Sequence, residues 1–254
     1  MTTLETGWAR LEERLRPGGA IVPYLTAGYP TMGRFVEALA LVAEVSEAVE
    51  IGIPFSDPMA DGATIQDSSR IALEEGATLE SIITALEGAG PLTSPLVVMS
   101  YLNPLMAFGF NRLLPRLSAV GVSALVVPDL PHEEAAELKA AANDEGVGLV
   151  ELVTPVTAPD RLRLLGAASQ GFTYAVTMTG TTGGNAEVGS DTYDYLNLVM
   201  EVSAPPVLAG FGVRSVEQVA ALSGYCDGVI VGSALVEVLA NDGDPVRFLQ
   251  GLRP

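Results

Sequence analysis

The sequence has 254 residues, of which 48% are hydrophobic, and this is enough apolar material for a substantial core. Its 31 acidic and 13 basic residues give a formal net charge of −18, which disfavours nucleic acid and anionic membranes as partners. The single cysteine excludes an intramolecular disulfide framework. The chain opens with a polar run rather than a signal peptide, and its apolar runs are too short to span a bilayer. We therefore expect a soluble cytoplasmic protein.

Short β-branched runs alternate with amphipathic helical stretches along the whole chain. A helix is predicted first, at residues 7–16. The predicted strands follow at residues 20–25, 48–53, 96–101, 124–127, 148–153, 172–177, 206–209 and 228–231. The helical patterns between them include residues 31–45, 66–75, 105–120, 132–145, 159–168, 192–202 and 216–222.

Eight strands that alternate with helices indicate parallel pairing, and eight is the number that closes a barrel. No G-x-G-x-x-G motif follows the first strand, which argues against a doubly wound dinucleotide fold. We therefore predict an α/β protein with one domain over residues 1–254, a (β/α)₈ TIM barrel whose bottom is plugged by the extra N-terminal helix. Functional residues of such barrels follow the carboxyl ends of the strands. The loops at 54–62 and 178–189 are the longest there and are candidate lids.

Glu50 lies inside the apolar run at residues 48–53. Strand alternation places it on one face with Gly52, while the branched side chains occupy the opposite face, which should meet the helices. Glu50 should therefore point into the barrel, where partial desolvation would raise its pKa and suit it to acid–base chemistry. Its position alone fits a buried structural glutamate equally well.

Asp61 ends the 54–62 loop, close above the end of that strand. A carboxylate there could stabilise positive charge developing on a substrate nitrogen. Taken alone, the Asp61-Gly62 pair is better explained as a simple turn, and Asp57 as a residue that braces its own loop.

Three segments of small residues, at 180–184, 210–212 and 232–234, follow the sixth, seventh and eighth strands. Barrels often bind phosphate there, through backbone N–H groups and the N-terminus of a short helix. Ser233 begins such a helix and would add its hydroxyl. Each segment alone is more simply explained as a glycine turn, but together they predict a phosphate site. The positive potential of this site would come from the main chain. An acidic protein could therefore bind a phosphate there without basic side chains.

The residue inventory excludes several mechanisms. The only lysine, Lys139, lies in a helix away from the strand ends, so Schiff-base and pyridoxal phosphate chemistry lack their nucleophile. The only histidine, His132, stands alone at a helix start and is expected to be exposed, so no metal site is expected. Cys226 precedes the eighth strand at the closed end and makes a poor nucleophile. Carboxylates remain, assisted by one of the tyrosines Tyr24, Tyr101 and Tyr174.

The segment at residues 49–66, VEIGIPFSDPMADGATIQ, resembles the signature of the tryptophan synthase alpha subunit family. Supporting segments lie at residues 22–28, 99–104, 127–131, 180–183, 210–212 and 232–233, so the resemblance covers essentially the whole chain. Tyr24 stands where phenylalanine is common in the family. Gly184-Asn185 replaces a frequent Ala-Arg or Ala-Glu, and the helix after Pro245 is short.

The resemblance implies a lyase that cleaves indole-3-glycerol phosphate by a retro-aldol reaction, with neither lysine nor metal. It makes Glu50 the acid–base residue, Asp61 the group that holds the indole N–H, and Tyr174 an auxiliary residue. It implies that substrate is also bound by Tyr24, Met99, Tyr101, Val126, Val153, Thr182 and Phe211. The implied phosphate-binding residues are Gly183, Gly212, Gly232 and Ser233.

The resemblance further implies an alpha2beta2 assembly with a beta subunit that docks over the barrel mouth, around residues 54–58 and 128–131, and receives the indole. Pyridoxal phosphate is expected only in that partner, and no cofactor is expected in this chain. Three alternatives stay open. The chain could be another phosphate-binding barrel, such as an isomerase of the histidine or tryptophan pathways, with a different acid–base pair. It could chiefly activate its beta partner, or it could be a stand-alone lyase that releases free indole.

Overall fold

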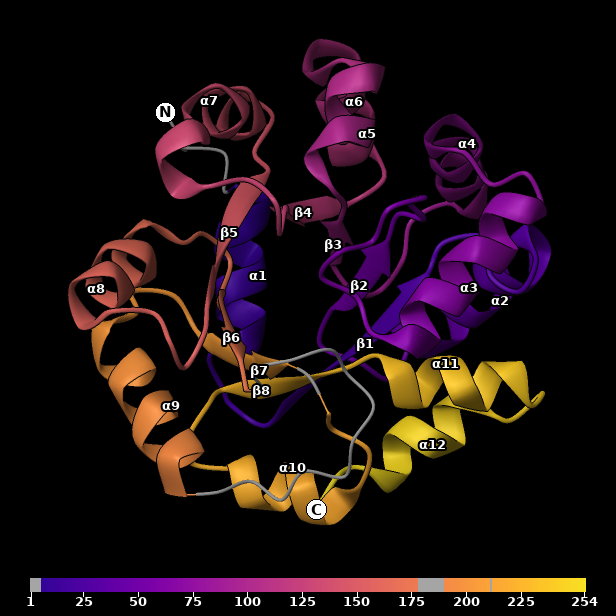
Figure 1. Ribbon diagram of the computed structural model, residues 1–254. Helices are drawn as coiled ribbons and strands as arrows, with labels where there is room; N and C mark the ends of the chain where they lie inside the picture. Colours follow the sequence, from indigo (N-terminus) through magenta and orange to yellow (C-terminus); the bar gives the residue numbers. More distant parts are fainter. Residues whose placement is uncertain (1–5, 178–189, 211) are drawn as a thin grey trace.

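The computed structural model describes residues 6–177, 190–210 and 212–254. Eight parallel strands pair in sequence order and close into a barrel, which confirms the predicted fold (Figure 1). All eight predicted strands are present. They are β1 (Ala20–Thr26), β2 (Val49–Gly52), β3 (Leu96–Met99), β4 (Val122–Val126), β5 (Gly148–Val153), β6 (Thr173–Val176), β7 (Val207–Gly210) and β8 (Gly228–Val231).

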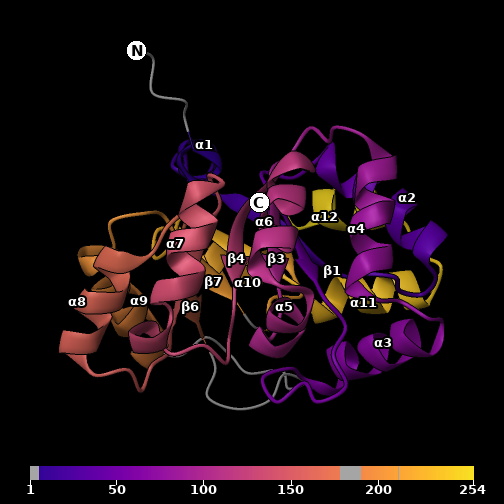
Figure 2. The same ribbon diagram turned by 90° about the horizontal axis from the view of Figure 1, so that it is seen from above.

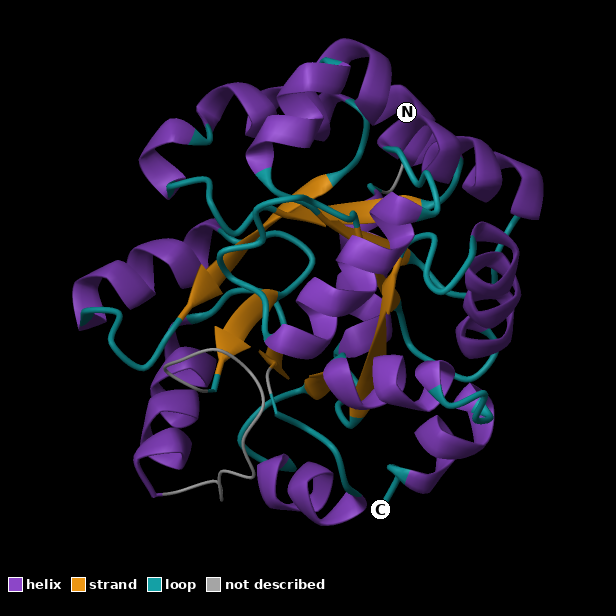
Figure 3. Cartoon of the chain, turned by 45° about the vertical axis from the view of Figure 1, so that its right-hand side comes forward, coloured by secondary structure: helices purple, strands orange, loops and turns teal. Residues whose placement is uncertain are grey.

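Helices form the outer layer around these strands (Figure 3). None of the helices that the structure describes is long and apolar enough to cross a membrane. The first six are α1 (Gly7–Leu15), α2 (Met32–Ala43), α3 (Ala63–Glu74), α4 (Leu79–Ala89), α5 (Leu102–Phe108) and α6 (Phe110–Ala119). The others are the 3₁₀ helix η1 (His132–Glu134), α7 (Ala136–Asp144), α8 (Pro159–Ala168), α9 (Ser190–Val202), α10 (Val216–Leu222), α11 (Ser233–Ala240) and the short α12 (Pro245–Gly251).

Two helical segments differ from the sequence-based expectation. The pattern at 105–120 is divided into α5 and α6 by Gly109, whose φ of 90° a helix does not allow. The pattern at 132–145 starts as η1, and the α-helix begins only at Ala136. Helix α4, which is not among the predicted helices, starts with a reciprocal capping box between Thr78 and Ser81.

Helix α1 closes the N-terminal end of the barrel, as predicted. Leu11 and Leu15 are fully buried. The backbone N–H of Gly7 donates to the carbonyl of Gly146, just before β5, and Glu12 accepts from the N–H of Gly171, just before β6. Figure 2 shows α1 at one end of the barrel, while α3 and α5 lie toward the other. The mouth is therefore at the carboxyl ends of the strands.

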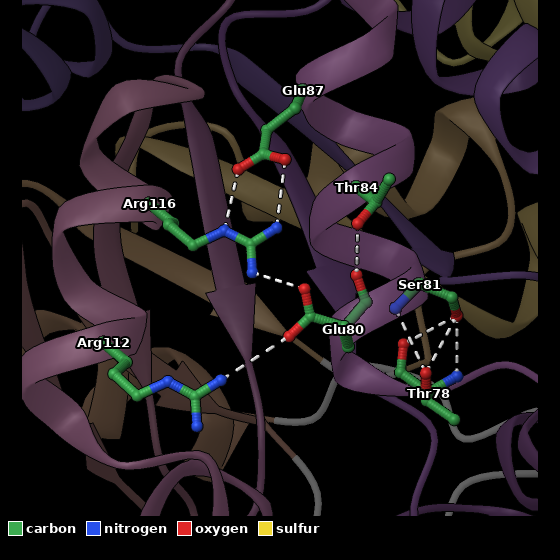
Figure 4. A network of polar contacts seen from close by, with 7 residues as sticks. All are labelled: Thr78, Glu80, Ser81, Thr84, Glu87, Arg112 and Arg116. Carbon is green, nitrogen blue, oxygen red and sulfur yellow. Dashed lines mark hydrogen bonds and ion pairs between the residues drawn. The ribbon is translucent and has the colours of Figure 1, made fainter.

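Helices of the outer layer are also joined by ion pairs. Arg116 of α6 donates to Glu87 at 2.8 Å and to Glu80 at 2.6 Å, and both acids belong to α4 (Figure 4). Arg112 lies 4.0 Å from Glu80 on the same side of α6. Because these groups are partly exposed, the network orients two neighbouring helices more than it stabilises the barrel.

The strand register fixes which side chains face the inside of the barrel. Tyr24 pairs with Glu50 on β2, and Glu50 pairs with Val97 on β3. In paired parallel strands, residues opposite one another point to the same face. Ile51, on the alternate face, is fully buried beneath the helices. Both faces of the sheet are therefore covered, and Glu50 is directed inward as the alternation predicts.

Candidate active site

A cavity with about 630 Å³ of empty space opens at the carboxyl ends of the strands. Seven of the lining residues are predicted site residues, namely Tyr24, Asp61, Met99, Tyr174, Gly212, Gly232 and Ser233. The described residues that complete the lining are Gly62, Ile65, Val213, Arg214, Ile230 and Ala234.

Glu50 lies in the barrel interior and is only 1% exposed. Its two carboxylate oxygens accept no hydrogen bond from any residue that the structure describes. Burial, and then the negative charge of Asp61, raise the pKa of Glu50 to about 8. The carboxyl group is therefore mostly protonated at neutral pH, and it can both give and take a proton near that pH.

Two tyrosines share the interior with Glu50. Tyr24 comes from the neighbouring strand β1, and Tyr174 comes from β6, farther around the barrel. Burial is the main cause that raises the pKa of each phenol well above its usual value, and the charges of Glu50 and Asp61 add to it. Both hydroxyls therefore stay protonated and can act as hydrogen-bond donors at neutral pH.

Two strand glycines, which are not among the predicted site residues, leave room for these tyrosines. A Cβ added to Gly52 would lie 1.9 Å from the Tyr24 hydroxyl oxygen. One added to Gly210 would lie 2.3 Å from a Tyr174 ring carbon. A glycine inside a strand often marks such a close approach, and this was the available sequence signal.

Asp61 is held at the cavity by Tyr101. The Tyr101 hydroxyl donates to Oδ2 of Asp61 at 3.1 Å and accepts the backbone N–H of Ala60 at 2.8 Å, while its ring stacks on Phe55 with centroids 5.1 Å apart. Burial raises the pKa of Asp61 to about 6, although the hydrogen bond from Tyr101 lowers it. Asp61 is thus mostly ionised at neutral pH while Glu50 is mostly protonated, a separation typical of acid–base pairs.

The simple-turn interpretation fits Asp57 better than Asp61. Ser56 donates its hydroxyl to the exposed Asp57 carboxylate at 2.6 Å, within the same loop. Gly62, in contrast, has an extended conformation with φ of −79° and serves as the N-cap residue of α3. The structure therefore places Asp61 at the junction between the loop and α3, facing the cavity.

Three predicted phosphate-binding residues, Gly212, Gly232 and Ser233, line the cavity, and they come from the segments after β7 and β8. Gly212 has a φ of 86°, which favours glycine. Gly232 is the N-cap residue of α11, and Ser233 is its first residue. The first turn of a helix has N–H groups without intrahelical acceptors, so this side of the cavity suits an anion.

Other predicted site residues lie outside the cavity lining. Tyr101 stands behind Asp61, and Val126 is buried on β4 beside Met99. On β5 the register pairs Leu152 with Tyr174, so Leu152 shares the inner face and Val153 turns toward the helices. Thr182, Gly183, Phe211 and the pair Gly184-Asn185 lie outside the described residues.

The prediction that His132 is exposed is wrong. Its side chain is 22% exposed, and its Nδ1 lies 2.7 Å from Oε1 of Glu151, a buried residue on the outer face of β5. Burial raises the pKa of Cys226 to about 11, so its thiol is a weak nucleophile. Lys139 donates to the carbonyl of Ala168. In the part of the chain that the structure describes, no group of three or more candidate metal ligands occurs.

Comparison with known proteins agrees with this geometry. The family model of the tryptophan synthase alpha chain matches residues 11–248. A tryptophan synthase alpha chain of Carboxydothermus hydrogenoformans is 39% identical over 232 residues, 91% of this chain and 87% of the relative. One of Nitratidesulfovibrio vulgaris is 39% identical over 249 residues, 95% of this chain and 97% of the relative.

Solved structures give the same result. A chain of the tryptophan synthase α2β2 complex of Pyrococcus furiosus has a TM-score of 0.86 and 36% identity, with 92% of this chain and 98% of that chain covered. A chain of Mycobacterium tuberculosis tryptophan synthase has a TM-score of 0.85 and 34% identity, with 97% and 98% covered. On the family match, these identities and this coverage, the chain belongs to the tryptophan synthase alpha chain family.

Proposed function

We propose that this tryptophan synthase alpha chain cleaves indole-3-glycerol phosphate with Glu50 as the acid–base residue and Asp61 as the carboxylate that stabilises charge. The products are indole and glyceraldehyde 3-phosphate. The observation that carries the residue assignment is the pair of carboxyl groups with separated pKa values, about 8 for Glu50 and about 6 for Asp61. Asp61 lines the cavity together with Gly212, Gly232 and Ser233, and Glu50 lies in the barrel interior on the strand that pairs with that of Tyr24, another lining residue.

The chemistry follows from these protonation states. Glu50 gives its proton to C3 of the indole ring, and the ring nitrogen becomes cationic. The bond between C3 and the first glycerol carbon then breaks, and its electron pair restores the aromatic indole. The hydroxyl on that carbon becomes the aldehyde as its proton returns to Glu50. Asp61, ionised and next to the nitrogen, favours the cationic intermediate, and the fixed charge requires no reorganisation during the reaction.

Glycines and buried tyrosines support the same reaction. Gly212, Gly232 and Ser233 would bind the phosphate through the main chain and the serine hydroxyl. Tyr24 and Tyr174, kept protonated, would pack against the indole and orient the reacting carbon. In this family pyridoxal phosphate belongs to the beta subunit, and the proposed steps use side chains of this chain alone.

The test is release of indole by the purified Glu50→Gln variant. We expect a decrease in kcat of about a thousandfold, because the amide cannot transfer the proton. Glu151→Gln, which changes a buried carboxylate outside the barrel, is the matched control and should keep near-normal turnover. Turnover of Glu50→Gln close to that of the unaltered chain would exclude Glu50 as the acid–base residue.

We further propose that a beta subunit docks over the barrel mouth to form an alpha2beta2 complex. Exposed apolar side chains lie in segments that follow three strands: Met59 after β2, Met106 after β3 and Val156 after β5, with exposed fractions of 79%, 60% and 80%. A beta subunit docked over the barrel mouth would cover these side chains. The similar Pyrococcus furiosus chain comes from an α2β2 complex.

Mixing the chain with a purified tryptophan synthase beta subunit tests this surface. Met59→Asp and Val156→Asp should weaken the complex, whereas Leu41→Asp, at an exposed position on α2, should not. Indole release measured with and without the beta subunit separates a stand-alone lyase from a partner-dependent one. A chain that lacks activity in both conditions but still stimulates the beta subunit would be an activator only.

A further inference from the structure

Arg214 lines the cavity beside Gly212 and Ser233. It lies between β7 and α10 and is not among the predicted site residues. We propose that Arg214 is a substrate-positioning residue that binds the phosphate ester of the substrate while Glu237 holds its guanidinium in place. This inference rests on the proposed function and adds a cationic side chain to a subsite that was expected to use the main chain alone.

The guanidinium is fixed by two hydrogen bonds. Nη1 donates to Oε2 of Glu237 at 2.8 Å, and Nη2 donates to Oε1 at 2.7 Å. Glu237 belongs to α11, the helix that begins at Ser233. Such a parallel two-point contact between arginine and carboxylate restricts both planes. The orientation of Arg214 is therefore set by the same helix whose N-terminus faces the anion side of the cavity.

Further contacts hold this pair from two other elements. The backbone N–H of Arg214 donates to Oε1 of Gln218 on α10 at 2.7 Å. Thr64, in the first turn of α3, lies 3.4 Å from Oε1 of Glu237 through its hydroxyl. Thr64 belongs to the segment after β2, Arg214 to that after β7 and Glu237 to that after β8, so the segments that follow three strands meet at this ion pair. Arg214 is thus preorganised.

Glu237 does not occupy all of the hydrogen-bond donors of Arg214. A guanidinium has five N–H groups, and the carboxylate takes two of them, so three stay available for a second anion. The side chain is one-third exposed, which leaves it accessible to a ligand. Arginine suits phosphate because its planar donors match the oxygens of the ester.

The negative charge of the site and of the whole chain explains why a cationic side chain would help to bind a phosphate. Arg214 is the one positively charged side chain among the described lining residues, which also include the carboxylate of Asp61. The whole chain has a formal charge of −18, so a phosphate ester approaches against a repulsive field. Backbone dipoles and one oriented guanidinium together oppose that repulsion locally.

The proposal is tested by comparing a ligand that has a phosphate with one that lacks it. Glycerol 3-phosphate and indole are titrated separately into the purified chain by calorimetry. Arg214→Met keeps an unbranched apolar stem and removes the guanidinium. We expect it to raise the Kd of glycerol 3-phosphate about tenfold and to leave that of indole unchanged. The KM for indole-3-glycerol phosphate should rise by a similar factor, while kcat changes by less than about twofold.

Two further variants keep the proposal testable if Arg214→Met does not fold. Arg214→Lys should recover part of the affinity for glycerol 3-phosphate, because the charge is kept and the planar fork is lost. Glu237→Gln should raise the Kd of glycerol 3-phosphate, because the amide can accept only one of the two hydrogen bonds that hold the Arg214 guanidinium.

Equal affinity of Arg214→Met and the unaltered chain for glycerol 3-phosphate would overturn the proposal. So would an equal loss of affinity for indole, which indicates that Arg214 only braces the fold, or a Kd in Glu237→Gln that is not raised. Failure of the unaltered chain to release indole would instead count against the proposed function. The calorimetric comparison remains valid in that case, because it does not depend on turnover.

Discussion

Tyr101 donates its hydroxyl to the Asp61 carboxylate at 3.1 Å and accepts the backbone N–H of Ala60 at 2.8 Å. One phenol therefore fixes both the last carboxylate of the loop and the backbone just before it. The hydrogen bond favours the ionised form of Asp61 and opposes the burial that raises its pKa to about 6. Tyr101 acts in this way as a positioning residue for Asp61.

Replacing Tyr101 with phenylalanine should make activity more sensitive to acid. Without the hydrogen bond the pKa of Asp61 rises, so a smaller fraction is ionised at low pH. We expect kcat/KM to fall about tenfold near pH 6 and less than about threefold near pH 8. The measurement is the pH profile of indole release. An acidic limb at the same pH in both proteins would contradict this role of Tyr101.

Glu50 should reduce the stability of the folded protein as the pH rises. Its pKa is raised from 4.5 to about 8, so the folded state keeps a proton that the unfolded chain loses above about pH 4.5. The stability linked to this proton is complete below the unfolded pKa and is lost as the pH rises toward 8. Glu50→Gln avoids the loss and should be more stable than the unaltered chain by about 3 kcal/mol at pH 7.

Urea unfolding near pH 4.5 and near pH 7 measures this difference, which should almost vanish at the lower pH. Asp57→Asn, at an exposed carboxylate of the loop after β2, is the control and should change stability by less than about 0.5 kcal/mol at both pH values. A Glu50→Gln variant that is no more stable than the unaltered chain at pH 7 would show that Glu50 is ionised or solvated.

Gly210→Ala should displace Tyr174, because the new Cβ would lie 2.3 Å from its ring. The interior is closely packed, so we expect a loss of about 1–3 kcal/mol in the free energy of unfolding and a decrease in kcat. Gly33→Ala is the matched control, since Gly33 is an exposed residue of α2 with nothing within 4 Å of the added Cβ. It should be neutral or stabilise by up to about 1 kcal/mol. Equal behaviour of the two variants would contradict the packing argument.

His132→Ala should destabilise the protein without affecting the reaction. It leaves the buried Glu151 carboxylate without the imidazole that lies 2.7 Å away, at a cost of about 3 kcal/mol. Changing both residues to leucine should recover most of this loss, because a buried apolar pair needs no hydrogen bonds. Urea unfolding of His132→Ala and of the double leucine variant, each compared with the unaltered chain, measures the loss and its recovery. A cost below about 0.5 kcal/mol for His132→Ala would show that the pair contributes nothing.

The sequence was most informative where residues alternate in character. Along residues 48–53, branched side chains alternate with Glu50 and Gly52, and this predicted the inward direction of Glu50. On β5 the residues Leu149, Val150, Leu152 and Val153 are apolar on both faces, because the strand is covered inside and outside. Alternation on this strand therefore does not indicate which residues face inward. The sequence predicted that Val153 lines the site, whereas the register pairs Leu152 with Tyr174 and directs Leu152 inward.

Contacts between distant residues were beyond the sequence for another reason. His132 was expected to be exposed because nothing near it in the chain suggests a partner, yet Glu151 is 19 residues away. Arg214 meets Glu237 at a separation of 23 residues. A pattern of hydrophobicity predicts an element and its buried face, but it does not predict which polar side chains of two elements meet.

By itself the sequence determined the eight-fold alternation of strands and helices, the inward face of β2 and the small residues at the anion side of the cavity. These depend on local periodicity and on backbone freedom, which neighbouring residues control. Only the tertiary structure decided the separated pKa values of Glu50 and Asp61, the bond from Tyr101 and the orientation of Arg214. Desolvation and hydrogen-bond geometry depend on which side chains the closed barrel brings together. These side chains come from strands that are far apart in the chain.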